Sequence, residues 1–183
     1  MTERHTTPKT DAAPAHQPTL RFLLGHPLHL IALGFGSGLS PFAPGTFGTL
    51  FAWATFRALD LALPANGFLL LILLGFVLGI VAIEKTGNAL GEIDHGSIVW
   101  DEIVPFWAVL WMLSQVMGDN LLWQGIAFAL FRFYDIKKPW PASYYDRKVK
   151  NGYGVMMDDV IAALYTVMTL AVLLVVVYLG THH

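Results

Sequence analysis

Long apolar runs separated by short polar stretches dominate this sequence of 183 residues. Two of the runs, 67–83 and 160–179, contain no charged residue. At about 1.5 Å per helical residue, each run can cross most of a hydrocarbon layer that is roughly 30 Å thick. Both runs therefore predict membrane-spanning helices.

Three further apolar runs also predict spans. Runs 103–117 and 121–133 flank Gly118-Asp119-Asn120, a sequence typical of a tight turn, and together they predict a transmembrane hairpin. Run 46–63 is interrupted by Arg57 and Asp60, which are expected to pair on one helix face and to point into a bundle.

The stretch 28–45 is apolar but rich in glycine and proline, which favours a re-entrant or interfacial segment over a full helix. Residues 1–27 are polar and predict a flexible cytoplasmic tail, with a short interfacial helix from Thr19. The fold class expected from these patterns is an all-α, polytopic membrane bundle of about five transmembrane helices plus that N-terminal segment.

Basic residues fall on one side of this predicted topology. The tail and the loops 84–102 and 134–159 share one face, whereas 64–66, 118–120 and 180–183 lie on the other face and contain no lysine or arginine. Because cytoplasmic loops are enriched in basic residues, the first face is expected to be cytoplasmic. The basic residues on it are Arg4, Lys9, Arg21, Lys85, Lys137, Lys138, Arg147, Lys148 and Lys150.

Composition supports membrane residence and excludes several classes of function. The chain is 55% hydrophobic and 13% charged, with a mean hydropathy of +0.56. Its net charge of -2 argues against nucleic acid as a partner. The lack of cysteine excludes thiolate catalysis and sulfur-ligated metals, so any metal site must use oxygen or imidazole ligands.

Acidic residues gather at the cytoplasmic ends of three predicted spans. Asp101 and Glu102 precede the third span, and Asp158 and Asp159 precede the last. One such pair alone would be explained as a helix cap worth about 0.3–1 kcal/mol. With Asp135 just after the fourth span, however, five carboxylates share one interface, and a hard divalent cation would relieve their repulsion. We predict one Mg²⁺, with Mn²⁺ as the next choice, held by Asp101, Asp135 and Asp159, with Glu102 and Asp158 beside it.

Several other residues could bind phosphate or move protons. Arg132 precedes Asp135 by three residues and could orient that carboxylate or hold a phosphate oxygen. Lys137 could also hold a phosphate oxygen. Lys138 and Trp140 are expected to be interfacial anchors. The turn at Gly45 and Thr46 offers backbone amides to an anion at a helix start. His95 is a candidate general acid or base.

Four motifs in order, GFGSGLSPFAPGTFGTL, DHGSIVWDE, FRFYDIKKPWP and NGYGVMMDDVIA, resemble the phosphatidylglycerophosphatase A family of bacterial inner-membrane lipid phosphatases. The resemblance spans about 28–179. It implies magnesium-dependent hydrolysis of phosphatidylglycerophosphate to phosphatidylglycerol and phosphate at the cytoplasmic face, by a single membrane-embedded catalytic domain over 28–183. Pro105 and Ala163 depart from the glycines expected of the family. The resemblance implies a functional core of Asp101, Glu102, Asp135, Asp158 and Asp159.

Three other functions compete with this interpretation. A lipid phosphotransferase would use similar metal chemistry, and a small ion-coupled transporter would also place charge within the membrane. A structural membrane protein would have little use for five clustered carboxylates. Attack on phosphorus by an aspartate and attack by metal-activated water both remain open.

Overall fold

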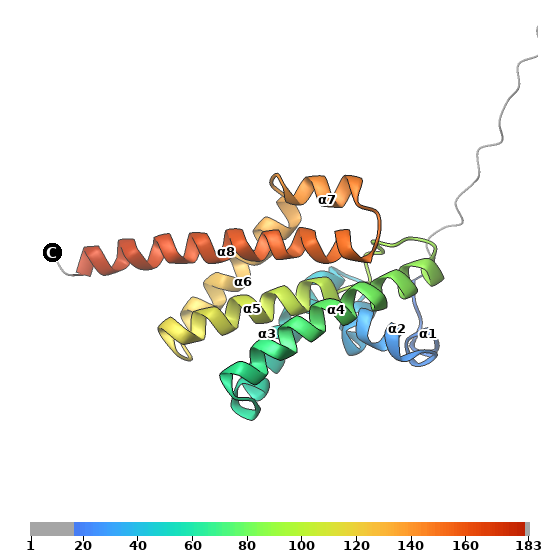
Figure 1. Cartoon of the computed structure of the whole chain (residues 1–183), viewed down its shortest axis with the longest axis horizontal. Coiled ribbons are helices and arrows are strands. Elements are labelled where there is room, and N and C mark those ends of the chain that lie inside the picture. The colour runs from blue at the N-terminus through green and yellow to red at the C-terminus, as the bar shows by residue number, and fades with distance from the viewer. Residues whose placement is uncertain (1–16, 182–183) are drawn as a thin grey trace, which may run out of the picture.

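The computed structural model describes residues 17–181, within which all regular secondary structure is helical (Figure 1). A helix forms over each of the five apolar runs, and the predicted all-α class is confirmed. The elements are α1 (Leu20–Leu24), α2 (Pro27–Ala32), the 3-10 helix η1 (Gly34–Leu39), α3 (Pro44–Ala62), α4 (Ala65–Leu90), α5 (Trp100–Met117), α6 (Leu121–Lys137), α7 (Ala142–Lys148) and α8 (Gly152–Thr181).

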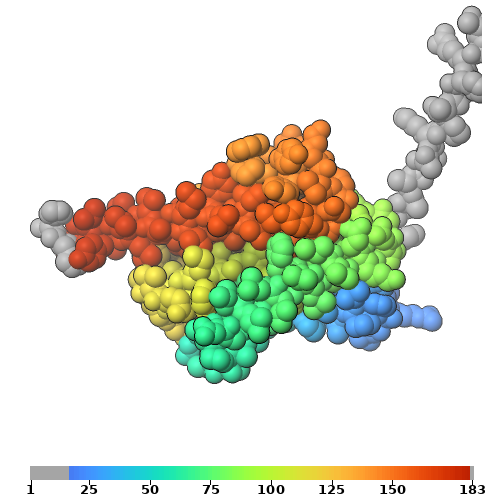
Figure 2. Space-filling view, in the orientation of Figure 1, coloured from blue at the N-terminus to red at the C-terminus, as the bar shows by residue number. Residues whose placement is uncertain are grey.

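Among the described helices, α4 and α8 are long and apolar enough to cross a membrane. Only 28% of the most apolar window of each helix is buried inside the protein, so most of its surface faces outward. Val77 and Val172 are among the exposed side chains, and the last part of α8 extends beyond the other helices (Figure 2). Such apolar surface supports membrane association. Crossing by α3, α5 and α6 as well stays a prediction.

The two ends of the bundle differ in the elements they contain (Figure 1). The end of α4, the loop 91–99 and the start of α8 lie together at one end, beside α1 and α2. The α5–α6 turn and the end of α8 lie toward the other end. The lysine-bearing end of α4 therefore lies beside the start of α8, and the side of the membrane that this end of the bundle faces stays a prediction.

The central helix is α5, which packs against α3, α4, α6 and α8. Ile103, Phe106 and Leu110 on α5 have no exposed surface. Two indole groups hold the helix in place: Trp100 Nε1 donates to the Gly75 carbonyl at 2.9 Å, and Trp107 Nε1 donates to the Ala52 carbonyl at 3.0 Å. These bonds fix the acidic start of α5 relative to α4 and α3.

The glycine-rich N-terminal segment forms α2 and η1 rather than one long helix, as its sequence predicts. Gly36 has a φ of 105°, which glycine adopts without a steric penalty. The Val99 amide donates to the Ala32 carbonyl at 3.0 Å, so the segment lies against the loop before α5. Thr19 caps α1, where the short helix was expected, while most of the tail predicted for 1–27 lies outside the described residues.

The predicted pairing of Arg57 with Asp60 is wrong. Arg57 instead pairs with Asp119 at 3.2 Å, and their side chains are 53% and 43% exposed. Gln124 Nε2 also donates to Asp119 at 2.9 Å, and this bond fixes the α5–α6 turn beside α3. The spacing of Arg57 and Asp60 in the sequence could not reveal Asp119 as the partner of Arg57, because Asp119 lies in the turn between two other helices, α5 and α6.

Candidate functional site

Carboxylates from α5, α6 and α8 converge at the end of the bundle that contains the basic loops. One oxygen from each of Glu102, Asp135 and Asp159 lies within 4.8 Å of the others. The three residues are 9%, 9% and 3% exposed, respectively. Asp101 and Asp158, their neighbours in the chain, are also buried. We refer to these five residues as the acidic cluster.

The closest group of three differs from the metal ligands expected from the sequence. It contains Glu102 where Asp101 was expected, together with Asp135 and Asp159. Consecutive helical residues point about 100° apart, so Asp101 and Glu102 approach Asp135 and Asp159 from different directions. Asp101 Oδ1 is nevertheless buried, and it has no hydrogen-bond partner among the described residues.

Arg132 connects two of the carboxylates. Its Nη1 donates to Asp135 at 2.5 Å and lies 3.0 Å from Glu102 Oε2. The bond to Asp135 follows the three-residue spacing seen in the sequence, whereas the contact with Glu102 joins α6 to α5. Arg132 Nε is buried without a partner among the described residues, so one donor of the guanidinium is available to a ligand.

The start of α3 lies directly against Glu102. Thr49 Oγ1 donates to the Glu102 carboxylate at 3.2 Å, and a Cβ atom at Gly45 would collide with that carboxylate. The Thr46 amide donates to the Ala43 carbonyl at 2.9 Å and is therefore used within the first turn of the helix. Sequence reasoning gave Thr49 no role, although it lies one helical turn after Gly45 on the same face.

Lys138 is not the interfacial anchor that the sequence suggested. Its backbone has a left-handed conformation at the end of α6, with a φ of 43°. Its Nζ donates to Asp158 at 2.5 Å and to Asp146 at 2.7 Å. Lys137, by contrast, is exposed, as is Trp140. Lys138 therefore neutralises Asp158 and ties α7 to the start of α8.

Lys138 and the carboxylates of Asp158 and Asp146 stabilise one another's charged forms. Burial lowers the pKa of Lys138, but the carboxylates of Asp158 and Asp146 outweigh it and raise the pKa above its ordinary value. Partial burial raises the pKa of Asp146, while the hydrogen bond from Lys138 more than offsets this and lowers the pKa overall. Both groups are therefore charged near neutral pH.

His95 lies in the loop before α5 and is 5% exposed. Its Nδ1 accepts a hydrogen bond from the Ser97 amide at 3.2 Å. Since Nδ1 is an acceptor, a neutral ring carries its proton on Nε2. With this bond in place, His95 can donate a hydrogen bond through Nε2 to a neighbouring oxygen, whereas full proton transfer would require protonation of Nδ1 and loss of the bond from Ser97.

Glu84, at the end of the second predicted span, has a structural role that the sequence did not indicate. Its Oε2 accepts a hydrogen bond from the Gly152 amide at 2.7 Å. That amide belongs to the first turn of α8, which carries Asp158 and Asp159. Glu84 thus fixes the start of the acidic helix to α4.

Comparison with known proteins identifies the family. The sequence profile described as "Phosphatidylglycerophosphatase A" matches residues 30–174. The chain belongs to this family. The Haemophilus influenzae phosphatidylglycerophosphatase A is 46% identical over 154 residues, which are 83% of this chain and 91% of that protein. The Escherichia coli phosphatidylglycerophosphatase A is 41% identical over 144 residues, 79% and 81% of the two chains.

A third relative in the comparison has a different name. It comes from Bacteroides thetaiotaomicron, is provisionally named a phosphatidylinositol-3-phosphatase, and is 44% identical over 152 residues, 78% of this chain and 91% of that protein. No solved structure gives a significant match to this chain. The family resemblance seen in the four sequence motifs is therefore confirmed by similarity to curated proteins over most of the chain.

Proposed function

We propose that this chain hydrolyses phosphatidylglycerophosphate to phosphatidylglycerol and phosphate in the cytoplasmic membrane of a bacterium. Family membership supports this function, since two relatives named for the activity align over 91% and 81% of their own lengths. The apolar surfaces of α4 and α8 are consistent with a membrane lipid as the substrate.

Two unpaired buried atoms, one in the acidic cluster and one on Arg132 beside it, carry the proposal. Asp101 Oδ1 is an acceptor and Arg132 Nε is a donor, and neither has a protein partner among the described residues. A buried polar group without a partner costs about 1–3 kcal/mol, so such atoms favour a bound ligand. An attacking water molecule or the phosphoryl group itself at the carboxylate, and a phosphate oxygen at the guanidinium, would engage both atoms.

The residues of the cluster fit a divalent metal ion. Oxygens around one Mg²⁺ lie about 2.1 Å from the ion and hence up to about 4.2 Å apart. The group formed by Glu102, Asp135 and Asp159, within 4.8 Å, comes close to that spacing. Mg²⁺ suits an all-oxygen site, and Mn²⁺ is the alternative. When bound, the ion would neutralise charge on the phosphate and polarise its oxygens.

The remaining residues have separable roles in this proposal. Arg132 holds a phosphate oxygen through Nε, and the exposed Lys137 approaches the headgroup from the aqueous side. The lack of a side chain at Gly45 lets the start of α3 lie close to Glu102. The backbone amide of Gly45 can then reach the phosphate. His95 donates a hydrogen bond from Nε2 to the leaving lipid oxygen and so stabilises the charge that develops on it.

Asp101 supplies the free carboxylate oxygen. It either attacks phosphorus or accepts the proton of an attacking water molecule, and both uses need an oxygen free of other hydrogen bonds. Asp158, neutralised by Lys138, keeps the start of α8 in position. In a lipid phosphotransferase, the closest rival function, the phosphoryl group would pass to another acceptor instead of being released as phosphate.

The proposed topology places the acidic cluster on the cytoplasmic side, with α3, α4, α5, α6 and α8 all crossing the membrane. The chain has no cysteine, so single cysteines can report which side a residue occupies. We expect a membrane-impermeant maleimide to label Asn66→Cys in intact spheroplasts. Lys148→Cys should react only after the spheroplasts are permeabilised. The opposite labelling pattern would reverse the orientation.

Phosphate release from phosphatidylglycerophosphate by the purified protein tests the proposed activity. The protein is first treated with a chelator, and Mg²⁺ or Mn²⁺ is then added back. We expect activity to disappear and to return with either ion. Equal activity with and without the chelator would show that the reaction does not require a metal ion.

A further inference from the structure

An apolar groove lies between α4, α5 and α8. It has a volume of about 270 Å³, and every side chain that lines it is apolar. Helices α4 and α8 pack tightly at the end of the bundle nearest the acidic cluster, where a Cβ atom at Gly79 would collide with Met156. The two helices separate away from that contact (Figure 1), which leaves the groove between them. Its walls include Leu73, Phe76, Pro105, Ala108, Val160 and Leu164.

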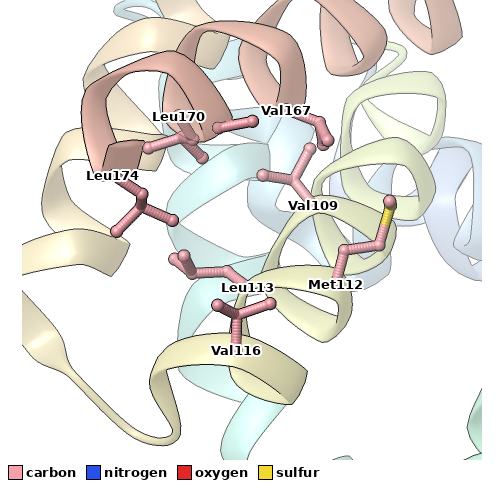
Figure 3. Close-up of a pocket in the computed structure, with 8 residues that line it drawn as sticks. Val109, Met112, Leu113, Val116, Val167, Leu170 and Leu174 are labelled. Atoms are coloured by element: carbon pink, nitrogen blue, oxygen red, sulfur yellow. The ribbon is translucent and has the colours of Figure 1, made fainter. Parts of the chain in front are cut away.

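A second hollow of about 130 Å³ extends the groove between α5 and α8 (Figure 3). The two hollows share Val109, Met112 and Val167. Val116 and Leu174 line the far part of the second hollow. From Pro105 to Val116 the path along α5 is about 17 Å at 1.5 Å per residue. The groove is therefore long and narrow, parallel to the helices.

Both helical walls of the groove lead to the acidic cluster. Asp101 lies on the same face of α5 as Pro105, Ala108 and Met112, which follow it by four, seven and eleven residues. On α8, Asp159 precedes Ala163 by one turn in the same way. Two carboxylates of the proposed site thus stand one helical turn from the start of an apolar channel.

We propose that this groove binds one acyl chain of the phospholipid substrate and so places the phosphate at the acidic cluster. The inference rests on the proposed function. A helix with its side chains is about 10 Å across, too wide for a hollow of this volume, whereas a single alkyl chain is narrow and flexible. The apolar lining favours an alkyl chain, and the charged end favours the phosphorylated headgroup at that point.

The test fills the groove and compares substrates of different chain length. Ala108→Phe adds a ring in the middle of the groove, and Leu73→Trp adds one from α4, where the native side chain is 57% exposed and has room to change. Val172→Phe is the matched control, because Val172 is exposed on α8 and lies outside both hollows. For each protein, kcat/KM is measured with dipalmitoyl and dihexanoyl phosphatidylglycerophosphate.

We expect both groove variants to lower kcat/KM for the dipalmitoyl lipid at least tenfold more than for the dihexanoyl lipid, whose shorter chains fill less of the groove. The control should leave the ratio of the two substrates at its wild-type value. Equal losses on both lipids, or no loss on the long one, would overturn the groove proposal alone. No turnover of either lipid by the wild-type protein would instead contradict the proposed function.

Discussion

Asp135→Asn is expected to lower the rate of phosphate release at least about 100-fold, because ligands and supports of a metal site commonly matter to that extent. Asp135 contributes one of the three oxygens that lie within 4.8 Å of one another, and it also accepts a hydrogen bond from Arg132. The amide keeps the size of the side chain but removes the charge that a cation requires. The rate should be measured over a series of Mg²⁺ concentrations.

The matched control is Asp60→Asn, since Asp60 lies beside the Arg57–Asp119 pair at the other end of the bundle. Its rate and Mg²⁺ requirement should equal those of the wild type. Loss of one carboxylate from a crowded group also relieves repulsion, so Asp135→Asn should unfold at close to the wild-type temperature. Near-normal activity and Mg²⁺ dependence in Asp135→Asn would show that Asp135 is not part of the metal site.

Gly45→Ala is expected to lower activity at least about tenfold, which equals about 1.4 kcal/mol in the activation barrier. The added methyl group would collide with the Glu102 carboxylate and push it away from Asp135 and Asp159. Overpacking of this kind costs about 1–3 kcal/mol when neighbours cannot move freely. Glu102 cannot, because Thr49 and Arg132 hold it.

Gly125→Ala is the control for Gly45→Ala. A Cβ atom at Gly125 would meet only the Trp53 ring at an ordinary contact distance of 3.7 Å, so α6 should accept it with full activity. Thermal unfolding of both variants separates a displaced carboxylate from a loss of fold. Wild-type kcat in Gly45→Ala would show that the close approach of α3 to Glu102 does not matter for catalysis.

The sequence predicted the helices well because their signal is local. A long apolar run that forms a helix satisfies its backbone hydrogen bonds within the segment itself, and each predicted run became a helix. The break in the N-terminal segment followed from its glycines and prolines. The bond between Arg132 and Asp135 was predictable for the same reason, since both residues lie on one helix three positions apart.

Contacts between helices were not predictable because they depend on how each helix is rotated about its axis. Nothing in the pair Asp101 and Glu102 indicates which carboxylate faces Asp135 and Asp159. The role of Lys138 depends on its left-handed backbone, which turns α7 back over α8. A partner for Arg57 came from the α5–α6 turn, which is distant in the sequence.

Substrate choice gives the most direct test of the central claim, that the acidic cluster is a metal-dependent site for a lipid phosphate. Phosphate release by purified protein in detergent is measured with phosphatidylglycerophosphate, a phosphatidylinositol 3-phosphate and soluble glycerol phosphate, each with Mg²⁺ or a chelator. We predict rapid, Mg²⁺-dependent release from phosphatidylglycerophosphate and little from glycerol phosphate, which lacks the lipid anchor. Equal turnover of glycerol phosphate, or full activity in the chelator, would contradict the account, and faster turnover of the inositol lipid would reassign the substrate.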